Sequence, residues 1–312
     1  MEHSDKVLTF GSCFAENIAE YFRFYRFNVL GNPFGVLYNP ASIYNSVKLA
    51  VDKKEFTKDD LVYDQSEWHS FYHHSDFSHH DENECLNRIN QSVNQTNRFI
   101  KTTDVIIITL GTSFVYEHLG KKIIVSNCHK IPQKEFRRFR LTIDEVKDYI
   151  QKIIEEVSHL NSQISYLFTV SPVRHWKDGA VDNQISKSTL LLPLSEIVNS
   201  NSNCYYFPSY EIMMDDLRDY RFYAEDMLHP NKIATDYIWE KFRQVHLSDG
   251  CVKLMNEIKK ISQARTHRPR NIHSEKHQKF LKYNIELIDK LKMGNPYLDL
   301  SEDREFFSAN LI

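Results

Sequence analysis

Residues 7–15 read VLTFGSCFA, and this stretch predicts a β-strand that runs through a glycine into an α-helix. Val7–Phe10 is continuously apolar, which is typical of a strand covered on both faces of a parallel sheet. Gly11 permits a tight turn, and the residues from Cys13 to about Tyr25 carry apolar side chains at helical spacing. These side chains are Phe14, Ile18 and Phe22. The stretch therefore predicts an α/β protein that begins with a strand and its crossover helix.

The same alternation of strands and helices continues along the chain. Further strands are predicted at residues 28–30, 104–110, 164–170 and 204–207. Helices are predicted at residues 40–51, 84–101, 141–160, 186–199 and 230–245. This alternation predicts a doubly wound, mostly parallel sheet flanked by helices, as in flavodoxin-like folds. Ligand sites in such sheets form beyond the carboxyl ends of the strands.

The character of the sequence changes at two places. Residues from about 55 to 85 are aromatic, rich in histidine and irregular, and they predict an insertion or lid. Beyond Cys251 basic residues cluster and a short amphipathic pattern resumes, so residues 251–312 are predicted to form a helical C-terminal extension. We expect one domain over residues 1–250. The extension would pack on that domain or on a second subunit, which would give a homodimer.

The overall composition excludes several classes of protein. The 312 residues carry a net charge of -3 and are 41% hydrophobic, which favours a globular protein that does not bind nucleic acid. The basic cluster Arg265, Arg268 and Arg270 is expected to be a solvated or subunit-contacting tail. No apolar run suits a membrane span or a signal peptide. Five scattered cysteines without a CxxC pair predict free thiols and a cytoplasmic protein.

The segment Gly11–Phe14 has the residues of a nucleophile site. It lies between a predicted strand and the N-terminus of a helix, where the helix dipole and free N–H groups favour an anion. A thiol at this position, such as that of Cys13, would have a lowered pKa and a larger thiolate fraction at neutral pH. The same N–H groups could also form an oxyanion hole. The segment equally suits a simple N-cap by Ser12 with a buried cysteine behind it.

A second constellation is Asp226-Met227-Leu228-His229-Pro230. Three-residue spacing lets the Asp226 carboxylate and the His229 imidazole lie on the same side of one turn, so that the carboxylate orients the ring toward a nucleophile. Pro230 fixes the start of the following helix. The alternative is a helix-capping Asp226 with a partly exposed His229.

Together the two motifs resemble the SGNH (GDSL-like) esterase/lipase superfamily, and within it the GSCFA family, named for the pentapeptide that stands here at residues 11–15. The resemblance covers roughly residues 7–245 and extends to further segments. These are residues 32–35 (NPFG), 109–113 (TLGTS), 127–130 (NCHK), 171–175 (SPVRH) and 218–223 (RDYRFY). It implies an SGNH-like fold and an ester hydrolase or acyltransferase that needs no cofactor or metal and acts on a small-molecule or glycan ester.

The resemblance also implies roles for individual residues. Glycine aligned on glycine places Cys13 at the nucleophile position, with Ser12 as the alternative, His229 as base and Asp226 as its orienting carboxylate. The superfamily's oxyanion hole uses the nucleophile N–H, a glycine after the second strand and an asparagine. The glycine corresponds to Gly31 or Gly35, which flank Asn32, and the asparagine position, two residues after Gly111, is occupied by Ser113. A serine there departs from the superfamily pattern.

Two further groups of polar residues are candidates for ligand contacts. Arg174 and His175 follow the strand at 164–170, where Arg174 would bind a substrate carboxylate or phosphate or form a structural ion pair. His129 is a similar candidate pocket residue. The histidines of residues 69–80 match no standard metal motif, so a flexible lid with exposed histidines is expected there and no metal.

Three functions are therefore open. The first is an ester hydrolase or acyltransferase with a covalent acyl-enzyme, acting by analogy on acylated carbohydrate. The second is a catalytically degenerate SGNH scaffold that binds a carbohydrate or a nucleotide-bearing ligand, which the serine at position 113 would favour. The third is a metal-dependent hydrolase that uses the histidine-rich segment.

Overall fold

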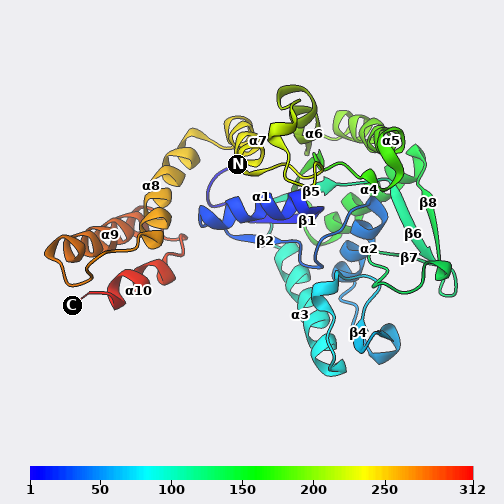
Figure 1. The fold of residues 1–312 in the computed structure, drawn as a ribbon, viewed down its shortest axis with the longest axis horizontal. Coiled ribbons are helices and arrows are strands. Elements are labelled where there is room, and N and C mark those ends of the chain that lie inside the picture. Colours follow the sequence, from blue (N-terminus) through cyan, green and yellow to red (C-terminus); the bar gives the residue numbers. More distant parts are fainter. Residues whose placement is uncertain (312) are drawn as a thin grey trace. The chain divides into compact units, whose positions relative to one another are not determined.

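The computed structural model describes residues 1–311 and contains a five-stranded sheet in an α/β fold (Figure 1). Its strands are β1 (Val7–Gly11), β2 (Val29–Gly31), β5 (Val105–Leu110), β9 (Ser165–Val170) and β10 (Cys204–Tyr206). They lie in the order β10-β9-β5-β1-β2. The pairings of β1 with β5, β5 with β9 and β9 with β10 are parallel. The predicted α/β class with a parallel sheet flanked by helices is confirmed.

Helices form about half of the chain outside this sheet. Those that begin within the first 240 residues are α1 (Cys13–Phe24), α2 (Pro40–Val51), α3 (Glu82–Ile100), α4 (Ile143–Leu160), α5 (Gly179–Ser200), α6 (Ser209–Glu211) and α7 (Lys232–His246). They are followed by α8 (Asp249–Thr266), α9 (Glu275–Gly294) and α10 (Ser301–Ala309). The predicted helices agree with these bounds to within two residues, except that α5 begins seven residues before the predicted residue 186.

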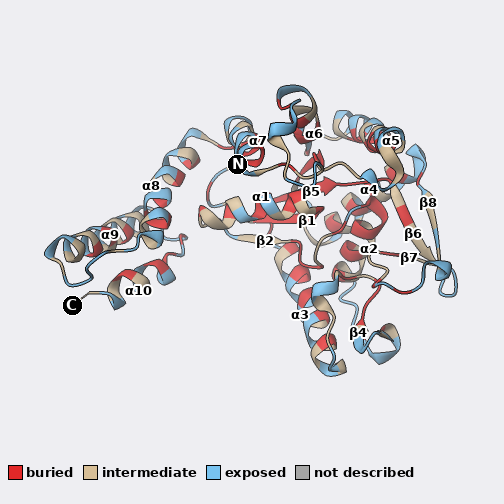
Figure 2. Ribbon diagram, in the orientation of Figure 1, coloured by how far each residue is buried: buried red, intermediate tan, exposed pale blue. Residues whose placement is uncertain are grey.

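Both faces of the sheet are buried, and Figure 2 shows strands β1 and β5 as buried segments. Every second residue of β1 and β5, including Leu8, Phe10 and Ile108, packs into one hydrophobic core. This core also contains apolar side chains of α2, α3, α4 and α5. The intervening Val7 and Ile107 are buried as well. Because neither face meets water, every position in these strands can be apolar, which explains the continuous runs seen in the sequence.

The strand order reverses between β1 and β5. From β1 the chain passes to β2 on one side, whereas β5, β9 and β10 follow on the other. Such a reversal is the place where doubly wound sheets form a crevice beyond the carboxyl ends of their strands. Gly11 pairs with Thr109, so the ends of β1 and β5 are level and Cys13 and Gly111 lie at the same edge.

Two small antiparallel sheets complete the strands. The hairpin β3 (Val62–Asp64) and β4 (Glu67–His69) lies within the segment predicted to be irregular. The other sheet, β6 (Phe114–His118), β7 (Ile123–Val125) and β8 (Phe136–Arg140), was not predicted. His69 and His73 are buried, so the expectation of exposed histidines in this segment is wrong for both. They contribute to packing: His73 stacks on Phe34 with ring centroids 4.6 Å apart.

By its contacts the chain divides into two compact units. Unit 2 comprises residues Val7–Ala19 and Leu30–Glu240 and holds the main sheet. Unit 1 comprises Met1–Lys6, Glu20–Val29 and the chain from Lys241 onward. Its C-terminal helices have a separate apolar core that includes Ile258, Leu281, Ile288 and Phe307. The expected domain boundary at residue 250 stays a prediction, as does a homodimer.

Candidate active site

Ser12 and Cys13 stand at the end of β1 but face different surroundings. Ser12 is 1% exposed, and its Oγ accepts the Phe14 N–H at 3.3 Å while its carbonyl accepts the Ala15 N–H at 2.8 Å. Ser12 therefore acts as the N-cap of α1. Cys13 is the first residue of the helix and is only half-buried, with its Sγ 3.7 Å from the Tyr38 hydroxyl oxygen.

Gly11 makes this turn possible. Its φ is +142°, and a Cβ at this position would lie 2.2 Å from the carbonyl oxygen of Thr109 on the neighbouring strand. Any side chain would therefore collide with the backbone of β5. The glycine allows β1 to stay paired with β5 up to the residue before Ser12.

Asp226 and His229 form the expected pair. The His229 Nδ1 lies 2.5 Å from the Asp226 Oδ2, and the Asp226 Oδ1 accepts the backbone N–H groups of His229 at 3.0 Å and Leu228 at 2.9 Å. These backbone hydrogen bonds, followed by the contact with the imidazole, lower the pKa of Asp226 to about 2. The carboxylate is thus ionised at neutral pH and accepts the proton on Nδ1, which leaves Nε2 of the ring as the basic nitrogen.

Cys13 and His229 both line a pocket of about 360 Å³ at the carboxyl edge of the sheet. The predicted site residues that line it are Ser12, Cys13, Gly111, Arg174, His175 and His229. Tyr38, Ser171, Val173, Trp176, Lys177 and Leu228 complete the lining. Asp226 is not among these residues, and it is connected to the pocket through its contact with His229.

Arg174 joins this pocket to the turn that carries His229. Its Nη2 donates to the Met227 carbonyl at 2.5 Å, and its guanidinium lies 4.4 Å from the ring centre of Tyr223 and 5.0 Å from that of Trp176. Met227 has a φ of +61°, so the hydrogen bond holds a left-handed residue in the middle of the turn. His175 lies beside Arg174, and its burial, followed by the charge of Arg138, lowers its pKa.

The structure does not bring Ser113 to the pocket. Ser113 is fully buried, and both its N–H and its hydroxyl are hydrogen-bonded to the Ser186 Oγ, at 2.8 and 3.1 Å. The Gly111 N–H is also occupied, since it donates to the Tyr38 carbonyl at 2.8 Å. Neither group is therefore placed to hold an oxyanion in this pocket.

Four other predicted residues also lie outside this lining. Gly31 ends β2, and the Asn32 side chain donates to Glu16 at 3.2 Å. Gly35 has a φ of +78° and lies against His74, which a Cβ would meet at 2.2 Å. His129 bonds the Ser70 carbonyl at 2.8 Å and stacks on His69. These positions support the loop and hairpin structure around the sheet.

Sequence reasoning missed two residues that shape the pocket. The Tyr38 hydroxyl contacts Cys13, and burial together with the neighbouring thiol raises the pKa of Tyr38. Lys187 is fully buried, and its Nζ donates to the carbonyls of Gly111 at 2.8 Å and Ser171 at 2.7 Å. It thus ties the ends of β5 and β9 together below the pocket, and burial lowers the pKa of Lys187 to about 7. Neither residue stands in a motif that points to this role.

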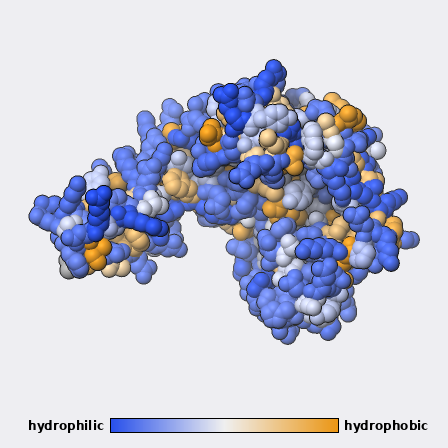
Figure 3. All heavy atoms as spheres, viewed as in Figure 1, coloured by the Kyte–Doolittle hydropathy of each residue, from blue (hydrophilic) through white to orange (hydrophobic). Residues whose placement is uncertain are grey.

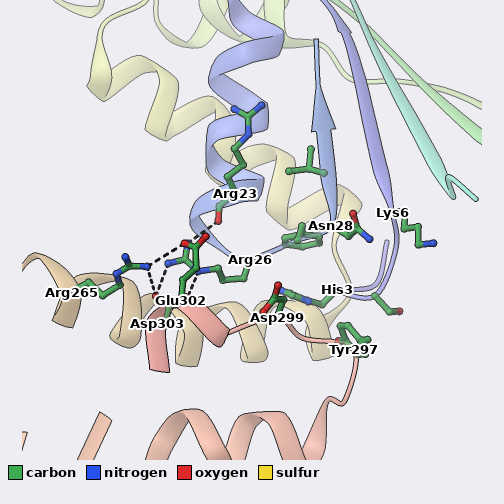
Figure 4. A pocket seen from close by; sticks show the side chains of 13 residues that line it. His3, Lys6, Arg23, Arg26, Asn28, Arg265, Tyr297, Asp299, Glu302 and Asp303 are labelled. Atoms are coloured by element: carbon green, nitrogen blue, oxygen red, sulfur yellow. Dashed lines mark hydrogen bonds and ion pairs between the residues drawn. The ribbon is translucent and has the colours of Figure 1, made fainter. Parts of the chain in front are cut away.

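A larger pocket of about 630 Å³ lies in unit 1. Figure 4 shows Arg26 and Arg265 converging on the buried Asp303. Both Arg26 contacts to the carboxylate measure 2.8 Å, and the Arg265 contact measures 3.0 Å. The lining of this pocket includes no cysteine, and its central charges are paired with one another. We therefore place the candidate active site in the smaller pocket of unit 2.

Within residues 1–311, no three His, Cys, Asp or Glu side chains are grouped so that they could hold a metal ion. None of the helices in the described chain has the length and apolar character needed to cross a membrane. The face drawn in Figure 3 is mostly hydrophilic, with apolar residues in small groups.

The fold and the pocket define an α/β protein with a thiol and a carboxylate-oriented imidazole at the switch point of a parallel sheet. The chain belongs to the GSCFA family, whose model matches residues 6–242. The model described as GSCFA domain protein, C-terminal domain, matches residues 258–312.

A search of curated proteins gave no match. Among solved structures, a protein described provisionally as a platelet activating factor from Streptococcus pneumonia is similar, with 11% identity and a TM-score of 0.40. The alignment covers 77% of this chain and 83% of that one. Similarity at this level supports no conclusion about function.

Proposed function

We propose that this protein is an SGNH-type ester hydrolase or acyltransferase that works through an acyl-cysteine intermediate. The observation that carries the proposal is the shared pocket of Cys13 and His229, with Asp226 bonded to the far side of the imidazole at 2.5 Å. A nucleophile, a base and a group that orients the base are the parts that acyl transfer requires. The strand order and the place of Cys13 after β1 support the assignment to the SGNH superfamily.

In the first half-reaction the His229 Nε2 takes the proton from the Cys13 thiol. The thiolate attacks the ester carbonyl carbon, and a C–S bond forms as the carbonyl electron pair moves to oxygen. When the tetrahedral intermediate collapses, the C–O bond to the alcohol breaks and His229 gives its proton to the leaving oxygen. Asp226 stays ionised throughout and stabilises the imidazolium.

In the second half-reaction His229 removes a proton from water or from an acceptor hydroxyl, and that oxygen attacks the thioester. The C–S bond breaks, and the thiolate recovers its proton from His229. Hydrolysis releases a carboxylic acid, whereas transfer releases a new ester. By analogy the acyl group comes from an acylated carbohydrate.

Two donors are proposed for the oxyanion in place of Ser113. One is the Cys13 N–H, because the next two N–H groups of the helix are directed to Ser12. The other is the Tyr38 hydroxyl, which contacts the Cys13 sulfur and whose raised pKa keeps its proton in place. Each such donor is typically worth roughly 3–4 kcal/mol in the transition state.

The test is mass spectrometry of the intact and digested protein after brief incubation with p-nitrophenyl acetate. Acetylation is expected on Cys13 in the wild type and in Ser12→Ala, and it should disappear in Cys13→Ala and His229→Ala. Cys128→Ala is the matched control, because Cys128 is also half-buried but lies outside the pocket lining. A Ser12 adduct would keep the enzyme class and overturn the choice of nucleophile.

The buried Ser113 favours one alternative, a binding protein on a retained scaffold. This alternative predicts no site-specific adduct and no turnover that depends on His229, with oxygen esters, thioesters or acetylated sugars. It would leave the close Asp226–His229 contact without a chemical purpose, and we therefore rank it second.

A further inference from the structure

The charges around the candidate active site are unbalanced. Arg174 and Lys177 line the pocket, and its lining includes no aspartate or glutamate. Other basic residues of unit 2 are paired: Arg138 contacts Asp178 at 2.6 Å, and Arg137 contacts Glu117 at 2.8 Å.

Both pocket cations are held in place by neutral groups. The Arg174 guanidinium is bonded to the Met227 carbonyl and lies on the ring of Tyr223. The Lys177 Nζ contacts the Tyr116 hydroxyl at 2.5 Å. For neither cation does the described structure contain an ion pair with a carboxylate. The alternative of a structural ion pair, left open for Arg174 by the sequence, is therefore not realised.

We propose that this pocket selects esters that carry an anionic group, either a carboxylate or a phosphate. That the ligand is an ester rests on the proposed function, whereas the recognition of its anionic group does not. Cations that form no ion pair with a carboxylate leave part of their hydrogen-bonding capacity and much of their charge for a ligand. The half-exposed Trp176 ring supplies an apolar surface beside them.

The volume limits the size of that ligand. At about 360 Å³ the pocket is near the lower end of the range for small-molecule sites. It suits a short acyl group and one ring or sugar unit with its anionic substituent. A matched pair of aryl esters of this size can therefore test the charge alone.

The first experiment compares 4-acetoxybenzoate with 4-acetoxybenzamide, which differ in charge but little in shape. The wild type should have the higher kcat/KM with the anionic ester. Lys177→Gln should lower the ratio of the two kcat/KM values by about tenfold, the size expected for one charge-assisted hydrogen bond. Lys177→Arg should retain most of the ratio. 4-Acetoxyphenyl phosphate distinguishes phosphate recognition from carboxylate recognition.

Lys101→Gln is the matched control, because it removes the same charge from an exposed position just before β5, at the opposite edge of the sheet. It should leave the ratio unchanged. Equal kcat/KM values for both esters in the wild type, or an equal effect of Lys101→Gln and Lys177→Gln, would overturn the inference.

A binding measurement separates this inference from the proposed function. Titration calorimetry of Cys13→Ala with 4-hydroxybenzoate, 4-hydroxybenzamide and inorganic phosphate needs no turnover. Preferential binding of an anion that Lys177→Gln weakens would support the inference even if no ester is cleaved. Turnover of esters without any preference for the anions would support the proposed function and refute the inference.

Discussion

The pocket of unit 1 and the pocket of unit 2 described above use charged residues in opposite ways. In unit 1, Arg26 and Arg265 meet at Asp303, which is 1% exposed, so the charges satisfy one another. In unit 2, Arg174 and Lys177 line a smaller pocket with no carboxylate in its lining. The larger pocket therefore has the electrostatics of a structural cluster, and the smaller one has those of a ligand site.

The largest effect is expected from a substitution of Asp226, which contacts the imidazole of His229 at the edge of the smaller pocket. Asp226→Asn should lower acyl transfer by roughly 10³- to 10⁴-fold, because an amide that donates to Nδ1 would favour the wrong tautomer of His229. Steady-state hydrolysis of p-nitrophenyl acetate measures the loss. Asp219→Asn is a fair control, since Asp219 is an exposed carboxylate that accepts the N–H of Arg221 two residues on. Comparable losses in the two variants would remove Asp226 from the mechanism.

The next largest effect is a loss of stability, and it tests the ion pairs of the pocket in unit 1. Asp303→Ala should lower the free energy of unfolding by roughly 3–5 kcal/mol, since it leaves two arginines without their buried partner. Urea denaturation of the full chain measures it. The neighbouring Glu302 has a side chain that is 91% exposed and lies 3.9 Å from Arg265, so Glu302→Ala should cost less than about 1 kcal/mol. If both variants were equally stable, the cluster would not be structural.

A smaller effect is expected from buried histidines as the pH falls. Burial lowers the pKa of His129 to about 4 and that of His73 to about 3. Between about pH 6.5 and 4 the unfolded chain binds protons that the folded chain excludes. The free energy of unfolding therefore decreases as the pH is lowered through this range, and it is constant above about pH 6.5. His129 alone contributes at most about 3 kcal/mol.

Urea midpoints measured from pH 7.5 to 4.5 test this dependence. His129→Gln should flatten the acid limb, whereas the same change at the exposed His80 should leave its slope as in the wild type. A limb that His129→Gln does not alter would show that other groups cause the acid sensitivity.

The smallest effect distinguishes the role of Ser12 as a helix cap from the proposed role of Cys13 as the nucleophile. Ser12→Ala removes the cap of the Phe14 N–H and should cost about 1 kcal/mol of stability. Acetylation of Cys13 should continue. A loss of acetylation without a loss of stability would reverse the roles assigned to these two neighbours.

Much of the fold could be predicted because its signals are local. The strand at 105–110 is apolar except for Thr109, since both of its faces are covered, and α2 has Pro40 at its first turn and Asn39 as its cap. The capping box of Thr142 and Glu145 at the start of α4 is another local signal. The start of α5 was missed because its apolar residues do not form one face, so no helical period is visible.

The candidate site was predictable only where residues stand in motifs. Cys13, Asp226 and His229 were found because a turn or a helix start places each in a recognisable context. Tyr38 and Lys187 contribute through contacts with residues 25 and 76 positions away, at Cys13 and Gly111, and such contacts leave no local pattern. Ser113 was assigned by its position in a motif, and its actual partner, Ser186, is 73 residues away.

The parallel pairing of β1 with β5 also has a consequence for how the protein is made. Val7 pairs with Val105, so β1 has only its neighbour β2 to pair with until about a hundred residues have followed it, and His229 comes more than 200 residues after the thiol. At typical rates of synthesis that interval is about 10–40 s. During this time the nascent chain contains Cys13 but not yet His229, the base of the proposed mechanism. In the proposed mechanism the nucleophile therefore stays without its base for most of the time that the chain takes to be made.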